Sequence, residues 1–156
     1  MTPIAPSDIE LAPFAERHLE TVYPWFDDPE TADRLGGRDW PWGLLKFSER
    51  DPDRRIGLLA LDRDDAVALV DLEVIDDSTV EVALVVAPER RRQGLARAIA
   101  AALERLPVAQ GRTIQAHVHA EHAASRALAA ASGFEEAGTE GEGFIRYRRS
   151  EVPAGG

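Results

Sequence analysis

The residues whose types and order point most clearly to a chemistry lie at positions 91–96, which read Arg-Arg-Gln-Gly-Leu-Ala. They stand where a predicted strand passes into a predicted helix. The first turn of a helix has unpaired backbone N–H groups and a partial positive charge, so it can bind a pyrophosphate. Gly94 keeps a side chain away from the backbone that a phosphate approaches, and Arg91 and Arg92 add positive charge. The segment therefore predicts an anion site, although a basic first turn with an ordinary packing glycine would contain the same residues.

Other phosphate-binding loops and cysteine chemistry are excluded because their residues are absent. The chain contains neither the Gly-x-x-x-x-Gly-Lys-Ser/Thr of a Walker loop nor the Gly-x-Gly-x-x-Gly of a dinucleotide site. It contains no cysteine, which rules out disulfides, zinc-thiolate sites and a cysteine nucleophile. His117, His119 and His122 could bind zinc, but no carboxylate pattern supports such a site, so we expect no metal.

A change of hydrophobic period identifies the elements that position the anion segment. Over Thr79–Val86 the apolar residues alternate as in a strand, which places Glu81 on the opposite face from the valines at 80, 82 and 86. Over Arg92–Leu106 apolar side chains recur at helical spacing among many alanines. Thr113–His119 is again a strand. This strand–helix–strand unit predicts two parallel strands joined by a right-handed crossover.

The rest of the chain predicts further strands, separated by turn residues, and flanking helices. The expected strands are Ile9–Leu11, Arg55–Leu61, Ala66–Ile75, Phe134–Ala137 and Phe144–Arg149, and the expected helices are Ala15–Val22, Pro29–Leu35, Leu44–Arg50 and Glu121–Ser132. Residues 40–43, Trp-Pro-Trp-Gly, are expected to break the helical pattern. The fold class is therefore α/β (α+β), with a mixed, mostly antiparallel sheet of six to seven strands. We expect a single domain over residues 1–150 and a disordered tail at 151–156.

Composition limits the partners and the location of the protein. The formal net charge of −10 disfavours nucleic acid and anionic membranes and favours cationic partners, although such a charge can serve solubility alone. No apolar run approaches the roughly 20 residues that cross a bilayer. The N-terminal residues lack the basic and apolar regions of a signal peptide, so we expect a cytoplasmic protein. The sequence leaves open whether the chain forms a homodimer.

Two blocks of the sequence resemble the GNAT superfamily of N-acetyltransferases. Family members carry Val-x-Pro-x-x-Arg-x-x-Gly-x-Gly/Ala, and residues 86–96 read Val-Ala-Pro-Glu-Arg-Arg-Arg-Gln-Gly-Leu-Ala. A second family block begins Asn-x-x-Ala/Ser and ends in Gly-Phe. Here it begins at His122 as His-Ala-Ala-Ser, and Gly-Phe follows at 133–134 with the family's spacing. Ser125 and the segments at 9–14 and 25–30 are similar to the RimJ/RimL-like branch.

The resemblance implies a GNAT fold and an acetyl-CoA-dependent N-acetyltransferase. Acetyl-CoA would donate the acetyl group directly to a primary amine in a ternary complex. The acceptor would be a peptide N-terminus, a polyamine or an aminoglycoside-like amine. The cofactor-binding residues that the resemblance implies are Leu84, Val85, Val86, Arg91, Arg92, Gln93, Gly94, Leu95, Ala96, Arg97 and His122.

The resemblance also implies two alternative general bases. Glu81 stands on the strand where several family members place a catalytic glutamate, although it could be a solvated carboxylate. His117 lies five residues before His122, where another branch has a glutamate, and imidazole titrates near neutral pH. It could instead be a hydrogen-bonded strand histidine. Asp71 and Glu73 are weaker candidates, so the choice of base stays open.

Two departures from the family pattern bear on catalysis. The usual asparagine is His122, and the tyrosine that often protonates the leaving thiolate would fall at Ala129, which cannot donate a proton. Ser125, a water molecule or no acid at all must then serve. These departures keep a second function open, namely a non-catalytic acyl-CoA-binding sensor. The sequence also does not distinguish an acetyl group from a slightly longer acyl group.

Overall fold

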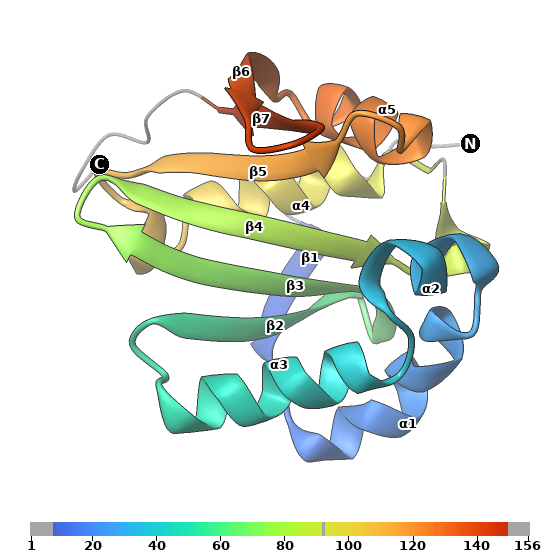
Figure 1. Ribbon diagram of the computed structural model, residues 1–156. Helices are drawn as coiled ribbons and strands as arrows, with labels where there is room; N and C mark the ends of the chain where they lie inside the picture. Colours follow the sequence, from blue (N-terminus) through green and yellow to red (C-terminus); the bar gives the residue numbers. More distant parts are fainter. Residues whose placement is uncertain (1–7, 92, 150–156) are drawn as a thin grey trace.

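The computed structural model describes residues 8–91 and 93–149, and in this part of the chain seven strands form one sheet (Figure 1). The sheet order is β1-β2-β3-β4-β5-β7-β6, with bounds β1 Ile9–Pro13, β2 Arg55–Asp62, β3 Asp65–Asp76, β4 Thr79–Val86, β5 Thr113–His119, β6 Glu135–Glu140 and β7 Phe144–Arg148. Neighbouring strands are antiparallel except β4 and β5, which are parallel. The predicted sheet is thereby confirmed. Arg92 and the predicted tail at 151–156 lie outside the described residues.

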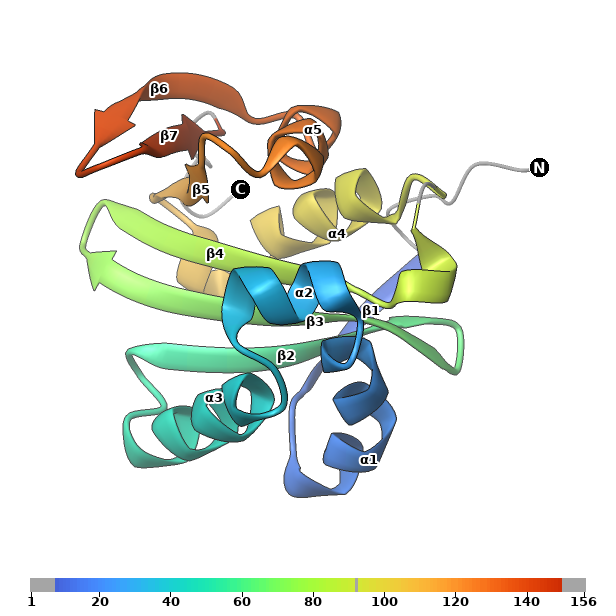
Figure 2. The same cartoon turned by 45° about the vertical axis from the view of Figure 1, so that its right-hand side comes forward.

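Helices cover both faces of this sheet (Figures 1 and 2). Their bounds are α1 Leu19–Val22, α2 Pro29–Leu35, α3 Asp39–Arg50, α4 Leu95–Glu104 and α5 Ala123–Ala131. One core lies between the sheet and α4 and includes Val80, Ile99 and Leu103. The other lies under α1 and α3 and includes Phe26, Leu44 and Val85. None of the helices in the described ranges is long and apolar enough to cross a membrane.

Strand β4 serves both cores through alternate residues. Val80 and Val86 pack on the α4 side, with Val82 beside them, whereas Val85 packs on the α1–α3 side. Because side chains alternate along a strand, Glu81 lies on the same face as Val85. The predicted alternation is therefore confirmed, and it assigns Glu81 to the face opposite α4.

Several helix boundaries differ from the sequence-based expectation. Helix α1 begins at Leu19 rather than Ala15, because Glu16–His18 form a 3-10 helix, and α5 begins at Ala123 rather than Glu121. Residues 40–43 do not break the helix, because α3 begins at Asp39 and runs through them. Pro41 falls in the first turn, where its missing N–H would have no partner within the helix. Helix α4 begins at Leu95 rather than Arg92, because Gly94 adopts a left-handed conformation with φ +77° and Pro88–Arg90 form a short 3-10 helix. The left-handed residue stops the helix from extending toward the strand.

The parallel pair separates after a short stretch of hydrogen bonding. Strands β4 and β5 are in register only from Thr79 opposite Thr113 to Glu81 opposite Gln115. On its other side β4 stays paired with β3 as far as Val86. The edge of β4 beyond Glu81 therefore has no strand partner on the β5 side, and this divergence opens the space that is described next.

Candidate active site

Two cavities meet where β4 and β5 diverge. The smaller has a volume of ≈ 260 Å³ and lies among β4, β5, α4 and α5. The larger, of ≈ 630 Å³, extends from the end of β4 along the start of α4 to α2 and α5. The residues that line both are Arg34, Leu84, Ala96, Ser125 and Leu128. The two cavities thus share walls at the last residues of β4, the first turn of α4 and the inner side of α5.

The first turn of α4 forms part of the wall of the larger cavity. Leu95, Ala96 and Arg97 line it, and the N–H groups in the first turn of a helix have no partner within that helix. A Cβ placed on Gly94 would meet nothing within 4 Å, so the left-handed φ of +77° is what requires glycine there. That glycine also lets a phosphate approach this backbone stays a prediction. The turn is nevertheless shaped to present backbone N–H groups to an anion.

Most of the residues implied for cofactor binding line the larger cavity. They are Leu84, Val85, Val86, Arg91, Gly94, Leu95, Ala96 and Arg97. Gln93 instead accepts a hydrogen bond from Arg90 Nε at 2.8 Å, and His122 lines the smaller cavity. Arg92 is outside the described residues. The structure therefore brings most of this set together at one site.

Arg91 joins the anion segment to α2. Its Nη2 donates to Asp28 Oδ2 at 3.1 Å and to Thr31 Oγ1 at 2.9 Å. Asp28 also caps α2, because Oδ2 accepts from the Thr31 N–H at 3.1 Å. Burial alone would raise the pKa of the Asp28 carboxyl, but the hydrogen bonds from Arg91 and Thr31 outweigh it and hold that pKa below its ordinary value. The cap of α2 and the anion segment are thus one hydrogen-bonded unit.

Arg34 lies at the junction of the two cavities, and the sequence analysis missed it. Its Nη1 donates to Ser125 Oγ at 2.9 Å and its Nη2 donates to the Leu84 carbonyl at 3.2 Å. Burial, and then repulsion by Arg91, lower the pKa of the Arg34 guanidinium. Figure 2 shows α2, which carries Arg34, beside the end of β4. This partly buried cation therefore links α2, β4 and α5 at the point where the cavities meet.

The two candidate bases contact each other. His117 Nδ1 lies 2.6 Å from Glu81 Oε1, and Gln115 Nε2 donates to the same oxygen at 3.2 Å. The register explains the contact: Glu81 is opposite Gln115, and residues two apart on β5 point to the same face. The sequence-based alternatives thus form a single pair on the face opposite α4.

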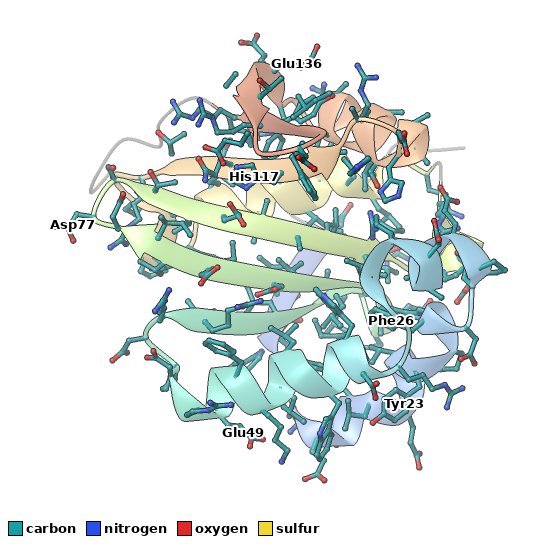
Figure 3. All side chains as sticks on the ribbon, viewed as in Figure 1. Tyr23, Phe26, Glu49, Asp77, His117 and Glu136 are labelled. Carbon is teal, nitrogen blue, oxygen red and sulfur yellow. The ribbon has the colours of Figure 1, made fainter. Side chains whose placement is uncertain are left out.

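The β6–β7 hairpin adds two charged residues that the sequence analysis did not assign to the site. His117 Nε2 lies 2.6 Å from Glu140 Oε2, without the alignment of a hydrogen bond. Arg146, which is opposite His117 in register, donates to Glu140 Oε1 at 2.6 Å. His117 therefore lies between two carboxylates, between β4 and the hairpin (Figure 3). Both contacts are ion pairs only when the imidazole is protonated.

The sequence matches the acetyltransferase (GNAT) family over residues 15–134, which is more than half of the chain. The chain belongs to the acetyltransferase (GNAT) family. A comparison with curated proteins gives no match.

Solved structures of acetyltransferases share the fold of this GNAT chain. An acetyltransferase from Thermus thermophilus is 21% identical with a TM-score of 0.73, covering 95% of this chain and 99% of its own. AAC(6')-Ib in complex with paromomycin and acetyl-CoA is 17% identical with a TM-score of 0.73, covering 90% and 92%. Spermidine N-acetyltransferase from Vibrio cholerae in complex with CoA and spermine is 18% identical with a TM-score of 0.64, covering 91% and 94%. At these identities the likeness shows the fold.

The remaining residues singled out from the GNAT motifs lie on α5 and next to it. Ser125 lines both cavities, and its hydroxyl accepts the hydrogen bond from Arg34. Ala129 is buried and lines the smaller cavity. The His122 ring lies 5.4 Å from the His119 ring, and His119 also packs edge-on against Phe144. Of the three histidines, His117 therefore contacts Glu81, whereas His119 and His122 belong to an aromatic cluster with Phe144.

Proposed function

We propose that this GNAT protein transfers the acetyl group of acetyl-CoA to a primary amine, by direct attack in a ternary complex. The observation that carries the proposal is the Glu81–His117 pair at a cavity that adjoins the first turn of α4. The cavity with the anion site and the cavity with the base share lining residues, so the two are adjacent. AAC(6')-Ib with acetyl-CoA and paromomycin, and the spermidine acetyltransferase with CoA and spermine, support the donor and the amine.

The larger cavity supplies the cofactor contacts in this proposal. The N–H groups of residues 95–97 and the Arg91 guanidinium would bind the pyrophosphate, since anions bind favourably at a helix N-terminus. The pantetheine arm would follow the edge of β4 at residues 84–86, which β5 leaves unpaired. Arg34 lies beside this path and gives it a partly buried cation that the motifs did not indicate.

His117 acts as the base in this proposal. Its side chain lines the smaller cavity, and its buried Nε2 atom faces Glu140 Oε2 at 2.6 Å, so in this proposal the half-exposed Glu140 side chain moves aside when Nε2 takes the amine proton. Nδ1 faces Glu81, which would fix the orientation of the ring. A lysine-type amine has a pKa of about 10.4, so a proton must be removed before attack, and a positioned base contributes about 10²–10⁴-fold. Glu140 would attract the ammonium group to the same place.

Ser125 protonates the leaving sulfur in this proposal. Because its Oγ accepts a hydrogen bond from Arg34, the hydroxyl proton remains available for donation. The hydroxyl also lies at the junction of the cavities, where the pantetheine sulfur would pass. His117 takes one amine proton, and the amine then forms the C–N bond to give a tetrahedral intermediate. Its collapse breaks the C–S bond as Ser125 protonates the leaving sulfur, which departs as a thiol. Ser125 would recover its proton from the amide nitrogen of the collapsing intermediate.

The two carboxylates beside His117 favour a cationic amine as the acceptor. Arg146 offsets part of the charge of Glu140, and Arg54 and Arg55 offset that of Glu73. Glu73, Glu81 and Glu140 lie on or beside the face of the sheet opposite α4, and Glu140 is about half exposed. A polyamine, an aminoglycoside-like amine or a peptide N-terminus meets this requirement. We further propose the RimJ/RimL-like branch, on the basis of Ser125 in the second motif. A non-catalytic acyl-CoA sensor is the alternative, because alanine at 129 removes the acid that many family members use.

The test supplies acetyl-CoA with panels of polyamines, aminoglycosides and peptides and measures release of the CoA thiol. We expect release with at least one class of amine, and a loss of about 10²–10⁴-fold in kcat for His117→Ala. Arg148→Ala, an exposed change on the neighbouring strand, serves as the control and should keep its activity. Tight binding of acetyl-CoA without thiol release across all three classes would favour the sensor.

A further inference from the structure

The smaller cavity extends well beyond the space that an acetyl group needs. It reaches from His117 at the divergence of the strands to the third turn of α4 and to Phe134, after α5. Its deep walls are apolar and come from four elements and the segment that follows α5. They are Val82, Ile99, Leu103, Val118, Ala129 and Phe134. Of these, Ile99 is fully buried and Leu103 is 2% exposed, so the far end lies within the core of the protein.

Small side chains keep this space open. Alanines at 96, 100, 116 and 129 line it from α4, β5 and α5. Ser132, a polar residue of this lining, already has a hydrogen-bond partner, because its Oγ donates to the Leu128 carbonyl at 2.7 Å. The walls therefore offer little to a polar ligand. An apolar cavity of about 150 Å³ binds small hydrocarbons, and the whole smaller cavity, which also includes the polar end at Arg34, His117 and Ser125, has a volume of ≈ 260 Å³.

The position of the cavity identifies its occupant. The larger cavity, which would hold the cofactor, joins it at Leu84 and Ser125. In the proposed function the thioester carbonyl would pass this junction into the smaller cavity, which His117 also lines, and the amine would approach from the face that carries Glu81. The substituent on the carbonyl must then point away from that face, toward α4. The space in that direction is the apolar end of the smaller cavity.

We propose that this apolar end is an acyl-chain pocket, and that the protein accepts straight-chain acyl-CoA donors of about four to six carbons as well as acetyl-CoA. This inference rests on the proposed function, and the chemistry of transfer from the thioester to the amine is the same. The C–N bond forms, the C–S bond then breaks, and the sulfur leaves as a thiol with a proton. Only the length of the transferred group changes.

The test measures equilibrium binding of CoA, acetyl-CoA, butyryl-CoA and hexanoyl-CoA to the full chain by calorimetry. Each buried methylene strengthens binding about fourfold at most, so we expect hexanoyl-CoA to bind at least tenfold more tightly than acetyl-CoA. Thiol release with an amine that accepts acetyl should follow the same order in kcat/KM. An affinity that stays constant or falls from acetyl-CoA to hexanoyl-CoA would contradict the acyl-chain pocket, and it would leave the proposed acetyl transfer unaffected. Failure of every CoA compound to bind would overturn the proposed function itself.

Adjacent alanines on α5 provide a matched pair of variants. Ala129 lines the cavity, whereas Ala130 is exposed. Ala129→Leu should fill the pocket and remove the tenfold preference for hexanoyl-CoA, and Ala130→Leu should keep it. Filling a real void also predicts that Ala129→Leu unfolds at a urea concentration at least as high as the wild type. A lower unfolding midpoint, or an unchanged preference for hexanoyl-CoA, would contradict the assignment.

Discussion

At the scale of single residues, Glu81 would act on the amine through His117. The contact of 2.6 Å between Glu81 Oε1 and His117 Nδ1 holds the ring, and Nε2 faces Glu140 Oε2 at 2.6 Å. We expect Glu81→Gln to lower kcat about tenfold with little change in KM, because the orientation of the base is lost but the binding surface is not. Glu81→Asp should recover part of this loss. Steady-state kinetics with acetyl-CoA and a competent amine measure both constants.

The control for this prediction is Glu73→Gln. Glu73 is directly opposite Glu81 in the sheet register, but it pairs with Arg54 and Arg55 rather than with His117. Its substitution changes the charge of the same face by the same amount. An equal fall in kcat for both variants would show that the overall field matters and that the Glu81–His117 contact does not.

Some residues of the site could be predicted from the sequence, whereas their contacts with one another could not. Glu81 and His117 were recognised separately because family members place bases on these two strands, but their mutual contact depends on the parallel register, which no local pattern encodes. Glu140 and Arg146 reach His117 only through pairing between β5 and β7. Arg34 stands in an ordinary helical pattern, and only the packing of α2 beside β4 gives it a role. The roles of Glu140, Arg146 and Arg34 therefore depend on strand pairing and helix packing between segments that are far apart in the sequence.

At the scale of elements, two glycines should respond to alanine in opposite ways. Gly94 has φ +77°, which is unfavourable for alanine, so Gly94→Ala should lower the free energy of unfolding by about 1 kcal/mol and weaken acetyl-CoA binding. Gly43 lies exposed within α3 without a positive φ, and a Cβ there would meet nothing within 4 Å. Gly43→Ala should therefore raise the free energy of unfolding by about 0.5–1 kcal/mol. Urea denaturation of both variants checks the signs, and a stabilised Gly94→Ala would contradict the role of the turn.

The link from α2 to the cavities gives a second prediction at this scale. Arg34→Ala removes the donors to Ser125 and Leu84, and it should raise KM for acetyl-CoA about tenfold, which corresponds to the loss of a charge-assisted hydrogen bond. Arg38→Ala is the matched control, because Arg38 is exposed and pairs with Asp27 at 2.6 Å. Initial rates at varied acetyl-CoA concentration separate the two variants. Equal values of KM would show that Arg34 has no part in cofactor binding.

At the scale of the whole molecule, hydrophobic periodicity and turn residues predicted the strands and the parallel crossover. The bounds of β4, β5 and α2 agree with the sequence-based expectation because strong local signals mark their ends. The divergence of β4 and β5 was not predictable in the same way. It depends on how α4 and α5 pack beside the sheet, and nothing within Thr79–Val86 marks the residue at which pairing stops. The cavities follow from that divergence.

The pH dependence of stability gives the last prediction, because several carboxyls have a pKa below the ordinary value in the folded chain. Asp28 is one of them, since hydrogen bonds from Arg91 and Thr31 outweigh the effect of burial. A group with a lowered folded pKa contributes stability above its unfolded value, about 3.9 for aspartate, and loses it as the pH falls through the folded value. Asp28→Asn should therefore be less stable than the wild type at pH 7, and the difference should shrink progressively below pH 4. Urea unfolding of both proteins at several pH values measures this difference, and the comparison cancels the general effect of a net charge of −10. A difference that stays constant down to pH 2 would show that the charge of Asp28 does not stabilise the junction between α2 and the anion segment.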